Sequence, residues 1–361
     1  MRITDITADP LTLGTTLVRL HTDEGPVGLG QFISRWENAP AYAAWFIDRF
    51  KPKLVGRDPF HSEGLWEELF FFAGGRYGAQ QVAAIDMASL DLQGKATGRP
   101  IYDLLGGAAR TEIPMYWSIG SGFRKSPEEM RADVEKGWES GFRAFKIRMD
   151  WHELRLDTNP EKDFAMFTLC REFLPEGIPL GFDANGGYTV STAIRQGMRM
   201  EALGIAHFEE PVPPHDLRGL RQVADALTVP VSAGEFEISR WRFRDMIDIG
   251  NPDILQPDIL NAGGPTEVKR ICDLAQVYSK PVMPHSPDAG IASFASLHVF
   301  ATQTNGTLPH EYSPEGFDWD VQRVQALFEE PILPVDGKIT LSDKPGLGLT
   351  LIDEALQKVL I

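Results

Sequence analysis

The apolar positions of this chain change their spacing at about residue 111. Residues 2–8 and 16–21 alternate between apolar and polar positions, as strands with one buried face do. The segment DEGPVG that follows predicts a tight turn. Helical spacing then appears in residues 39–51, 62–72 and 78–96. The first part of the chain therefore predicts a small sheet followed by helices.

From Thr111 onward, short apolar segments with β-branched or aromatic residues alternate with amphipathic helices. Strand and helix in alternation predict a parallel sheet, and eight such units predict a closed barrel. The eight candidate strands are PMYWS (114–118), FRAFKIR (142–148), IPLGFDAN (178–185), IAHFEEP (205–211), VPVSAGE (229–235), PDILQPD (252–258), KPVMPH (280–285) and TLPHEY (307–312).

We therefore expect an α/β fold built around a modified (β/α)8-type TIM barrel. Residues 1–112 are predicted to form an α+β capping domain and residues 113–330 the barrel. Residues 331–361 read as an extended tail that packs back on the capping domain and completes it.

Acidic residues stand at the ends of three consecutive candidate strands. Asp183, Glu209 and Glu235 are spaced by 26 residues each, about one βα unit, so they should share one height on the C-terminal rim. Three clustered carboxylates repel one another unless a cation lies between them. An all-oxygen set with open positions suits Mg²⁺ or Mn²⁺. We predict a metal site, against the alternative of three separate solvated acids.

Basic residues end the second candidate strand, and an acid and a histidine end the sixth and seventh. Lys146 and Arg148 share one face because strand side chains alternate. Asp258 can orient His285 and raise its basicity. Since strands two and six lie about half a turn apart in an eight-stranded ring, these groups should flank the metal from opposite sides.

Each of these residues also has a structural interpretation when it is taken alone. Lys146 could be an exposed lysine at a strand end, and His285 could cap a helix or lie at the surface. Arg148 could form a salt bridge to Asp150 or Glu153. The common rim position favours the catalytic interpretation.

Three further polar residues lie at strand ends. Glu311 could hydrogen-bond a substrate carboxylate if it is protonated, or polarise it through a shared proton; alternatively it could bridge an arginine. Asn185 could hold a hydroxyl group or a water of the metal ion, or it could form an Asx-turn. Glu210 should point away from Glu209 and form an ion pair within the barrel.

Composition limits the classes of partner. The net charge of −16 argues against nucleic acid, which requires a basic surface. The longest apolar segments fall short of the ~18 residues of a membrane span, and the start MRITDITADP lacks a secretory h-region. Cys170 and Cys272 make neither a disulfide framework nor a zinc knuckle. We expect a cytoplasmic protein with buried thiols and without a membrane or nucleic-acid partner.

Seven short motifs together carry a family resemblance. They are FKIR, FDANG, FEEP, SAGE, QPD, PHS and HEY, and their order and spacing resemble those of the enolase superfamily. The Asp258–His285 pair with the terminal Glu311 is similar to the mandelate racemase subgroup and its acid-sugar dehydratases. The resemblance spans the chain, including GGRYG near residue 75 and the closing KPGLGL.

The resemblance implies a substrate carboxylate bound to Mg²⁺ and a base that removes the α-proton. It implies that the metal, Lys146 and Glu311 stabilise the resulting enediolate. In acid-sugar dehydratases of this subgroup, a histidine then protonates the departing β-hydroxyl, which leaves a 2-keto-3-deoxy sugar acid. The implied partners are a small acid sugar and further copies of the chain, as a dimer or octamer.

Arg148 departs from the family pattern, in which a second lysine often stands there. Because the pKa of arginine exceeds about 12, it is a poor proton shuttle and a better anchor for a carboxylate or polyol. This favours elimination over two-base racemisation, with His285, Lys146 and Arg148 all open as the base. A racemase, epimerase or lactone cycloisomerase is the alternative, and a binding protein without chemistry is disfavoured.

Two segments are predicted to form the roof of the site. The connection from Pro10 to Thr15 is short, which suggests a roomier roof than in relatives with a longer lid. Arg76 and Tyr77, next to two glycines, are predicted to contact the far end of the substrate.

Overall fold

The first hundred residues form a sheet covered by helices. The computed structural model describes residues 1–34, 38–149, 156–287, 289–306, 308–315 and 321–361, except the side chains of Arg76 and Tyr77. Strands β1 (Ile3–Pro10), β2 (Thr15–Thr22) and β3 (Val27–Ile33) pair antiparallel in that order. The helices are α1 (Ala39–Leu54), α2 (Ser62–Phe72), the 3₁₀ helix η1 (Gly75–Gly78), α3 (Ala79–Thr97) and α4 (Ile101–Leu104).

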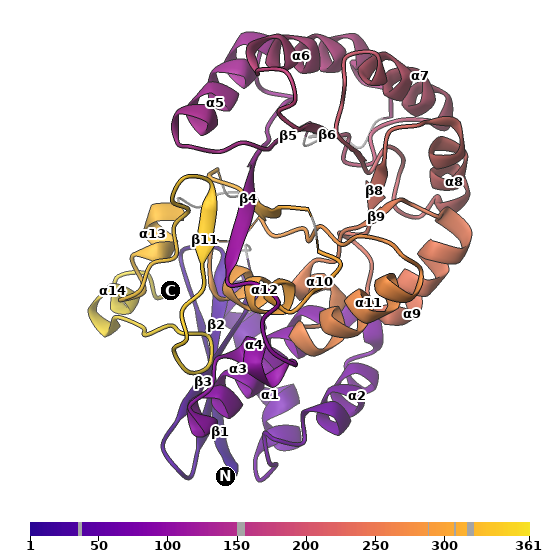
Figure 1. The fold of residues 1–361 in the computed structure, drawn as a ribbon. Coiled ribbons are helices and arrows are strands. Elements are labelled where there is room, and N and C mark those ends of the chain that lie inside the picture. Colours follow the sequence, from indigo (N-terminus) through magenta and orange to yellow (C-terminus); the bar gives the residue numbers. More distant parts are fainter. Residues whose placement is uncertain (35–37, 150–155, 288, 307, 316–320) are drawn as a thin grey trace.

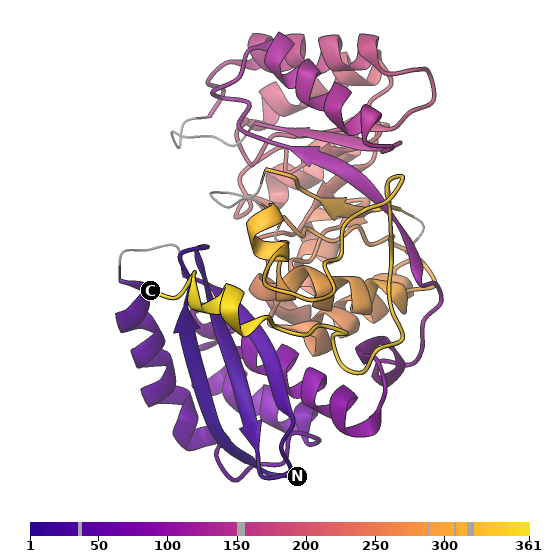
Figure 2. The ribbon, with the colours of Figure 1, turned by 90° about the vertical axis from the view of Figure 1, so that its left-hand side faces the viewer.

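Helix α3 packs so closely on β3 that two positions of the strand have no room for a side chain. A Cβ built on Gly28 or Gly30 would lie 2.0 Å from the carbonyl oxygen of Ala88 or Ala84. Glycine is therefore required at both positions because any side chain would separate the helix from the sheet. Figure 2 shows this sheet and its helices below the barrel.

A parallel barrel follows the capping layer (Figure 1). The strands pair in the order β10-β4-β5-β6-β7-β8-β9, so the last barrel strand returns to the first. Their bounds are β4 (Glu112–Ile119), β5 (Phe145–Arg148), β6 (Leu180–Asp183), β7 (Phe208–Glu209), β8 (Val231–Ala233), β9 (Ile254–Leu255) and β10 (His310–Tyr312). The outer helices are α5 (Pro127–Glu139), α6 (Pro160–Phe173), α7 (Val190–Glu201), α8 (Leu217–Ala226), α9 (Ser239–Asp245), the π-helix η2 (Met246–Gly250), α10 (Ile259–Ala262), α11 (Pro265–Val277) and α12 (Ile291–Ala301).

The seventh barrel position is held by single bridges rather than by a continuous strand. Val282 pairs with Leu255 and His285 pairs with Asp258, both in parallel. Pro281 and Pro284 lack the N–H groups that a continuous ladder needs, which explains why the predicted strand is shorter in the structure.

The end of the chain returns to both the barrel and the capping sheet. It contains α13 (Val321–Gln325), β11 (Lys338–Thr340) and α14 (Asp353–Gln357). Strand β11 pairs antiparallel with β4, and Leu360 bridges to Leu11 at the end of β1. Figure 2 shows this yellow segment against the top of the capping sheet.

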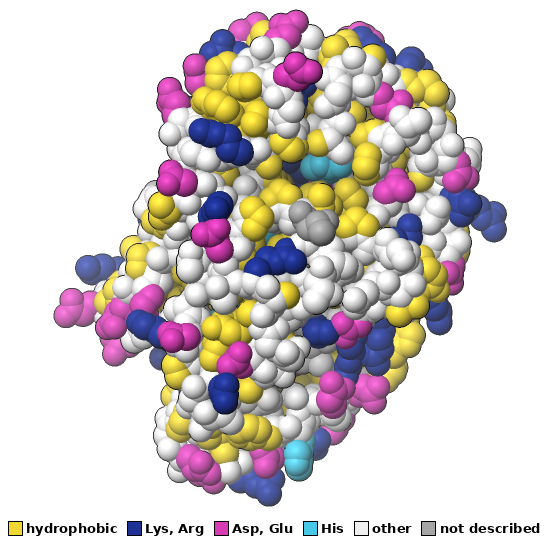
Figure 3. Space-filling view, viewed as in Figure 1, with side chains coloured by type: hydrophobic (Ala, Val, Ile, Leu, Met, Phe, Trp, Pro, Cys, Tyr) yellow, Lys and Arg dark blue, Asp and Glu magenta, His cyan; other side chains and the backbone are white. Residues whose placement is uncertain are grey.

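These elements confirm the predicted fold, a barrel of the TIM type with an N-terminal capping layer that the tail contacts. Both cysteines are buried and free, as predicted. Within the described ranges, no helix is both long and apolar enough to cross a bilayer. Figure 3 shows one end of the barrel as a hollow that contains a histidine side chain.

Candidate active site

Three carboxylates converge inside the barrel. Asp183 and Glu209 end β6 and β7 in paired register, and Glu235 follows β8 after Gly234, whose φ is +134°. One oxygen from each lies within 4.8 Å of the other two, and all three residues are buried. The structure therefore brings together the three residues whose spacing predicted a common height, and this group could hold a metal ion.

The carboxylates strain one another electrostatically. Burial, with added repulsion from Glu209, raises the pKa of Asp183 far above its usual range. Burial also raises the pKa of Glu235. Glu209 behaves in the opposite way. Burial raises its pKa, but Lys146, His207 and Gln256 together outweigh burial and lower the pKa. A cation among these oxygens would relieve the repulsion, so the donor set fits the hard, oxygen-preferring Mg²⁺.

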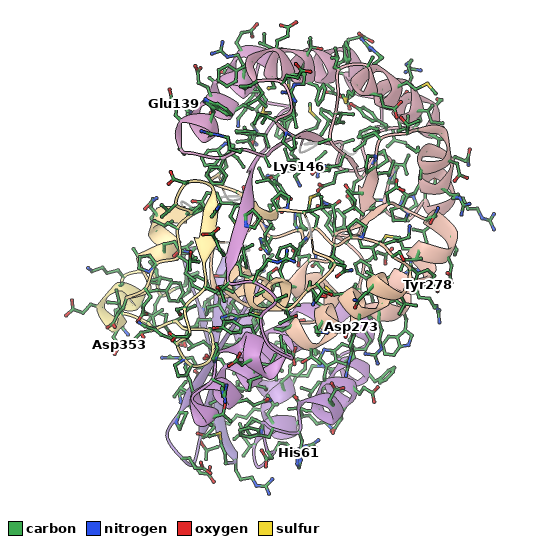
Figure 4. All side chains as sticks on the ribbon, in the orientation of Figure 1. His61, Glu139, Lys146, Asp273, Tyr278 and Asp353 are labelled. Atoms are coloured by element: carbon green, nitrogen blue, oxygen red, sulfur yellow. The ribbon has the colours of Figure 1, made fainter. Side chains whose placement is uncertain are left out.

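Lys146 lies within the ring of strands and contacts several acids (Figure 4). Its side chain is completely buried, and Nζ lies 2.6 Å from Glu209, 3.2 Å from Glu311 and 3.7 Å from Asp183. Burial alone would lower the pKa of Lys146, but these carboxylates raise it well above its ordinary value. Lys146 is thus an ammonium ion that compensates the acidic cluster, and the alternative of an exposed strand-end lysine is wrong.

His285 and Asp258 form the predicted pair on the other side of the cluster. Nδ1 of His285 lies 2.8 Å from Asp258, and Nε2 lies 3.2 Å from Glu235. The other oxygen of Asp258 accepts from the backbone N–H groups of Leu260 and Asn261 and so caps α10. Burial lowers the pKa of His285, but Glu235 and Asp258 outweigh it and raise this pKa to about 10. The surface-histidine alternative is wrong because the ring is buried.

Glu311 is fixed from two sides. One oxygen accepts from the backbone N–H of Ser286 at 2.7 Å, and the other faces Lys146. Burial raises the pKa of Glu311, but Lys146 and His285 outweigh it and lower this pKa to about 2. The group is therefore an ionised carboxylate here, in contrast to the protonated donor considered from the sequence.

Asn185 lies directly against Asp183. Its backbone N–H donates to Oδ1 of Asp183 at 2.8 Å, and its side-chain amide lies 3.1 Å from Oδ2. The φ of Asn185 is +44°, a left-handed conformation that asparagine tolerates. The side-chain acceptor of this turn is Asp183, so it is not the Asx-turn that Asn185 itself was predicted to form. Contact of Asn185 with substrate stays a prediction.

Glu210 differs from its prediction. Within the described part of the chain it forms no ion pair, and its buried Oε2 has no hydrogen-bond partner. Burial, followed by repulsion from Glu235 and Asp183, raises the pKa of Glu210 far above its usual value. The predicted ion pair is wrong because the charges that act most strongly on Glu210 are those of other acids, Glu235 and Asp183.

Of the remaining predicted residues, one lies beside the cluster and two have side chains that the structure does not describe. Arg148 ends β5 beside Asp183 in register and is buried, while its alternative partners Asp150 and Glu153 lie outside the described residues. The side chains of Arg76 and Tyr77 are not described, and their backbone belongs to η1. Their contacts with substrate therefore stay predictions.

Two buried residues beneath the cluster were missed from the sequence. Gln256 donates its amide to Oε2 of Glu209 at 2.7 Å, and Nε2 of His207 lies 3.6 Å from the same oxygen. Each stands two positions before a predicted site residue, Gln256 before Asp258 and His207 before Glu209. The alternation of strand side chains could have placed both inside the barrel.

Comparison with known proteins matches nearly the whole chain. Residues 129–355 match the family model "Enolase C-terminal domain-like", and residues 11–106 match "Mandelate racemase / muconate lactonizing enzyme, N-terminal domain". A D-galactarolactone cycloisomerase of Agrobacterium fabrum is 32% identical over 94% of this chain and 89% of its own length. A D-galactonate dehydratase of Pectobacterium atrosepticum is 29% identical over 98% of this chain and 93% of its own.

A solved structure agrees with these matches. The mandelate racemase/muconate lactonizing protein of Paracoccus denitrificans, crystallised with magnesium, superposes with a TM-score of 0.93 at 33% identity. The superposition covers 99% of this chain and 97% of that one. The chain therefore belongs to the enolase superfamily, in its mandelate racemase subgroup.

Proposed function

We propose that this protein is a Mg²⁺-dependent dehydratase of a sugar acid, which yields a 2-keto-3-deoxy acid. The observation that carries the proposal is the buried His285–Asp258 pair facing Glu235, with Lys146 on the other side of the acidic cluster. The relatives named D-galactonate dehydratase and D-galactarolactone cycloisomerase support a sugar acid as the class of substrate.

Asp183, Glu209 and Glu235 would hold the Mg²⁺ ion. They form a buried, oxygen-only donor set whose negative charge exceeds the positive charge beside it. A bound Mg²⁺ supplies positive charge that acidifies the α-proton of a substrate carboxylate.

Lys146 supports this chemistry as a fixed positive charge. It is completely buried and lies close to three carboxylates, so it retains its proton. An ammonium held in this way stabilises negative charge that develops on the substrate but does not accept the α-proton. Glu311 holds Lys146 in place through its own contact with the backbone of Ser286.

His285 is the group that we assign to proton transfer. Asp258 holds Nδ1, so Nε2 faces the acidic cluster. Of the charges that raise the pKa of His285, Glu235 is the strongest, and Glu235 is also a proposed metal ligand. Neutralisation of Glu235 lowers this pKa toward the range in which an imidazole can both accept and donate a proton.

The reaction breaks the Cα–H bond and the Cβ–O bond. His285 accepts the α-proton, and a proton from Nε2 joins the departing hydroxyl to form water. The enol that remains tautomerises to the 2-keto acid, so atoms and charge balance without an oxidant. Arg148 is left to bind the carboxylate or a hydroxyl group, since a guanidinium is a poor base.

A second candidate reaction is isomerisation, which the 32% identity to a lactone cycloisomerase favours. It begins with the same removal of an α-proton. The intermediate then either takes up a proton on carbon or rearranges a lactone ring, instead of losing water. In D₂O it gives isomer or α-deuterated substrate without any 2-keto product.

The test is a panel of mono- and diacid sugars incubated with Mg²⁺ and assayed for 2-keto acids. Dehydration predicts a 2-keto-3-deoxy product from at least one member of the panel. Deuterium incorporation without a keto product would replace dehydration by isomerisation. Absence of both products from a protein shown to bind Mg²⁺ would refute the proposed function.

A further inference from the structure

Glu209 is oriented by two side-chain donors on opposite oxygens. Nζ of Lys146 lies 2.6 Å from Oε1, and Nε2 of Gln256 lies 2.7 Å from Oε2. All three residues are almost completely buried, so water does not compete for these contacts. Rotation of the carboxylate would break both hydrogen bonds at once, and a lost bond to a buried charged group is expensive.

We propose that Gln256 is a positioning residue of the metal site, which holds the carboxylate of Glu209 in the orientation that receives the cation. This inference rests on the proposed Mg²⁺ site. Each carboxylate oxygen offers two lone-pair directions, so one donor on each oxygen leaves one direction on each for the ion. Residues that orient metal ligands in this way typically contribute 10- to 100-fold to metal affinity.

The position of Gln256 is itself determined by the barrel. Its backbone N–H donates to the carbonyl of Ala233 on β8, which fixes the residue directly after β9. The amide has one favourable orientation, because the reversed one would place its oxygen against the carboxylate of Glu209. Two residues later Asp258 caps α10, so the same short segment carries both Gln256 and the partner of His285.

Asp183 has an equivalent arrangement, with the backbone N–H and side-chain amide of Asn185 on its two oxygens. Two neighbouring ligands of the triad therefore each receive a side-chain amide from a residue that is not itself a ligand. This repetition favours a role in orienting the ligands over an isolated hydrogen bond of the core.

His207 does not duplicate the contact of Gln256. Its Nε2 lies 3.6 Å from Oε2 of Glu209, beyond hydrogen-bond distance. The ring occupies space left by Gly181, where a Cβ would lie 2.1 Å from the imidazole. His207 is thus packed against Gly181 of the neighbouring strand β6.

The test compares Gln256→Met, which has similar length but no donor, with wild type. The matched control is Gln196→Met, because Gln196 is also fully buried and donates one bond, to the carbonyl of Pro160, outside the site. Metal-stripped proteins are titrated with Mn²⁺ alone, by calorimetry and by the electron paramagnetic resonance signal of free Mn²⁺. Unfolding of each variant is followed by circular dichroism.

We expect the Kd for Mn²⁺ to rise 10- to 100-fold in Gln256→Met and to stay at the wild-type value in Gln196→Met. If Gln256→Met does not fold, Gln256→Asn keeps the amide but withdraws it from Glu209, and the same rise is expected. A Kd within twofold of wild type in a folded Gln256 variant would overturn the inference alone. A wild-type protein that binds no Mn²⁺ would overturn the metal site and the inference together.

Discussion

The two sides of the acidic cluster carry different kinds of basic residue. Lys146 on one side is a fixed positive charge, and His285 on the other can transfer protons. Lys146 is held by several carboxylates and has no exposed surface, so its charge is permanent. Asp258 holds Nδ1 of His285 at 2.8 Å, while its Nε2 lies at the cluster, 3.2 Å from Glu235. A group that transfers protons needs one such nitrogen, so chemistry is expected on the histidine side.

The first prediction is that His285→Asn abolishes dehydration but leaves metal affinity nearly unchanged. Loss of a general acid–base group typically lowers kcat about 10²- to 10⁴-fold. Asparagine carries no charge and is not a proposed ligand, so the Kd for Mn²⁺ should stay within a few-fold of wild type. Steady-state assays and calorimetry check this, and a variant with wild-type kcat would remove His285 from the mechanism.

The second prediction concerns Asp163, which lies on α6 away from the cluster. Its Oδ2 accepts from the hydroxyl of Tyr188 at 2.6 Å, and its Oδ1 is buried without a partner. Burial raises the pKa of Asp163 from 3.8 to about 7. The native state therefore keeps a proton on Asp163 that the unfolded chain loses. The contribution of this proton to the free energy of unfolding is complete below pH ~4 and is lost as the pH rises through 7.

Asp163→Asn should remove that dependence. Between pH 4 and 7 the wild-type free energy of unfolding should fall more steeply than that of the variant, by up to about 1.4 kcal/mol per pH unit. Urea unfolding at pH 5 and pH 8 measures both slopes. Asp86, whose pKa burial also raises to about 7, titrates in both proteins and cancels in the difference. Parallel slopes would contradict the assignment.

Among the elements, α10 links helix capping to the histidine pair. This four-residue helix is capped by Asp258, whose Oδ1 accepts from two backbone N–H groups while Oδ2 faces His285. One carboxylate thus fixes the start of a helix and the orientation of an imidazole. The helix and the ring are positioned together because they share this acceptor.

The third prediction separates these two functions of Asp258. Asparagine caps helices nearly as well as aspartate, so Asp258→Asn should keep stability within about 0.5 kcal/mol of wild type but lower kcat. Asp258→Ala should lower kcat and also lose about 1–2 kcal/mol of stability with the cap. Thermal unfolding and steady-state assays measure the two effects. Equal stability losses in both variants would show that the cap is unimportant.

The regular elements of this fold were predictable, whereas the contacts between them were not. The 26-residue spacing of Asp183, Glu209 and Glu235 predicted their shared height because each βα unit repeats one rise of the barrel. The ionised state of Glu311 depends on Lys146, which lies far away in the sequence. Local pattern carries no information on such a distance, so the sequence left its protonation open.

Gln256 is a second residue whose contact could not be predicted from local sequence pattern. Its inward direction follows from alternation with Asp258, but its bond to Glu209 depends on how neighbouring strands are staggered. Side chains without charge are also easily passed over when a sequence is searched for chemistry. The positioning groups are therefore harder to predict than the ligands that they hold.

At the scale of the whole molecule, three distant segments share one hydrophobic core. Leu11 and Leu17 of the capping sheet, Ile291 of the barrel and Leu356 of the tail belong to the same buried cluster. The amide oxygen of Gln31 on β3 accepts from the backbone N–H of Ile291 at 2.8 Å, at the start of α12. The capping layer is thus attached to the barrel shortly after His285, and the tail covers that attachment.

The fourth prediction is that Leu356→Ala destabilises the whole molecule but leaves the metal site intact. Leu356 is 2% exposed and packs in the shared cluster, so its truncation should cost about 2–5 kcal/mol. Val277→Ala serves as the control because Val277 is 80% exposed and should change stability by less than about 0.5 kcal/mol. Since β6, β7 and β8 carry the triad without contacting the tail in their pairing, the Kd for Mn²⁺ at 25 °C should match wild type.

Urea unfolding and Mn²⁺ titration measure the two quantities. A loss of Mn²⁺ affinity in folded Leu356→Ala would mean that the tail acts on the triad through the barrel, and a stability loss no larger than the control would mean that the tail is dispensable to the core.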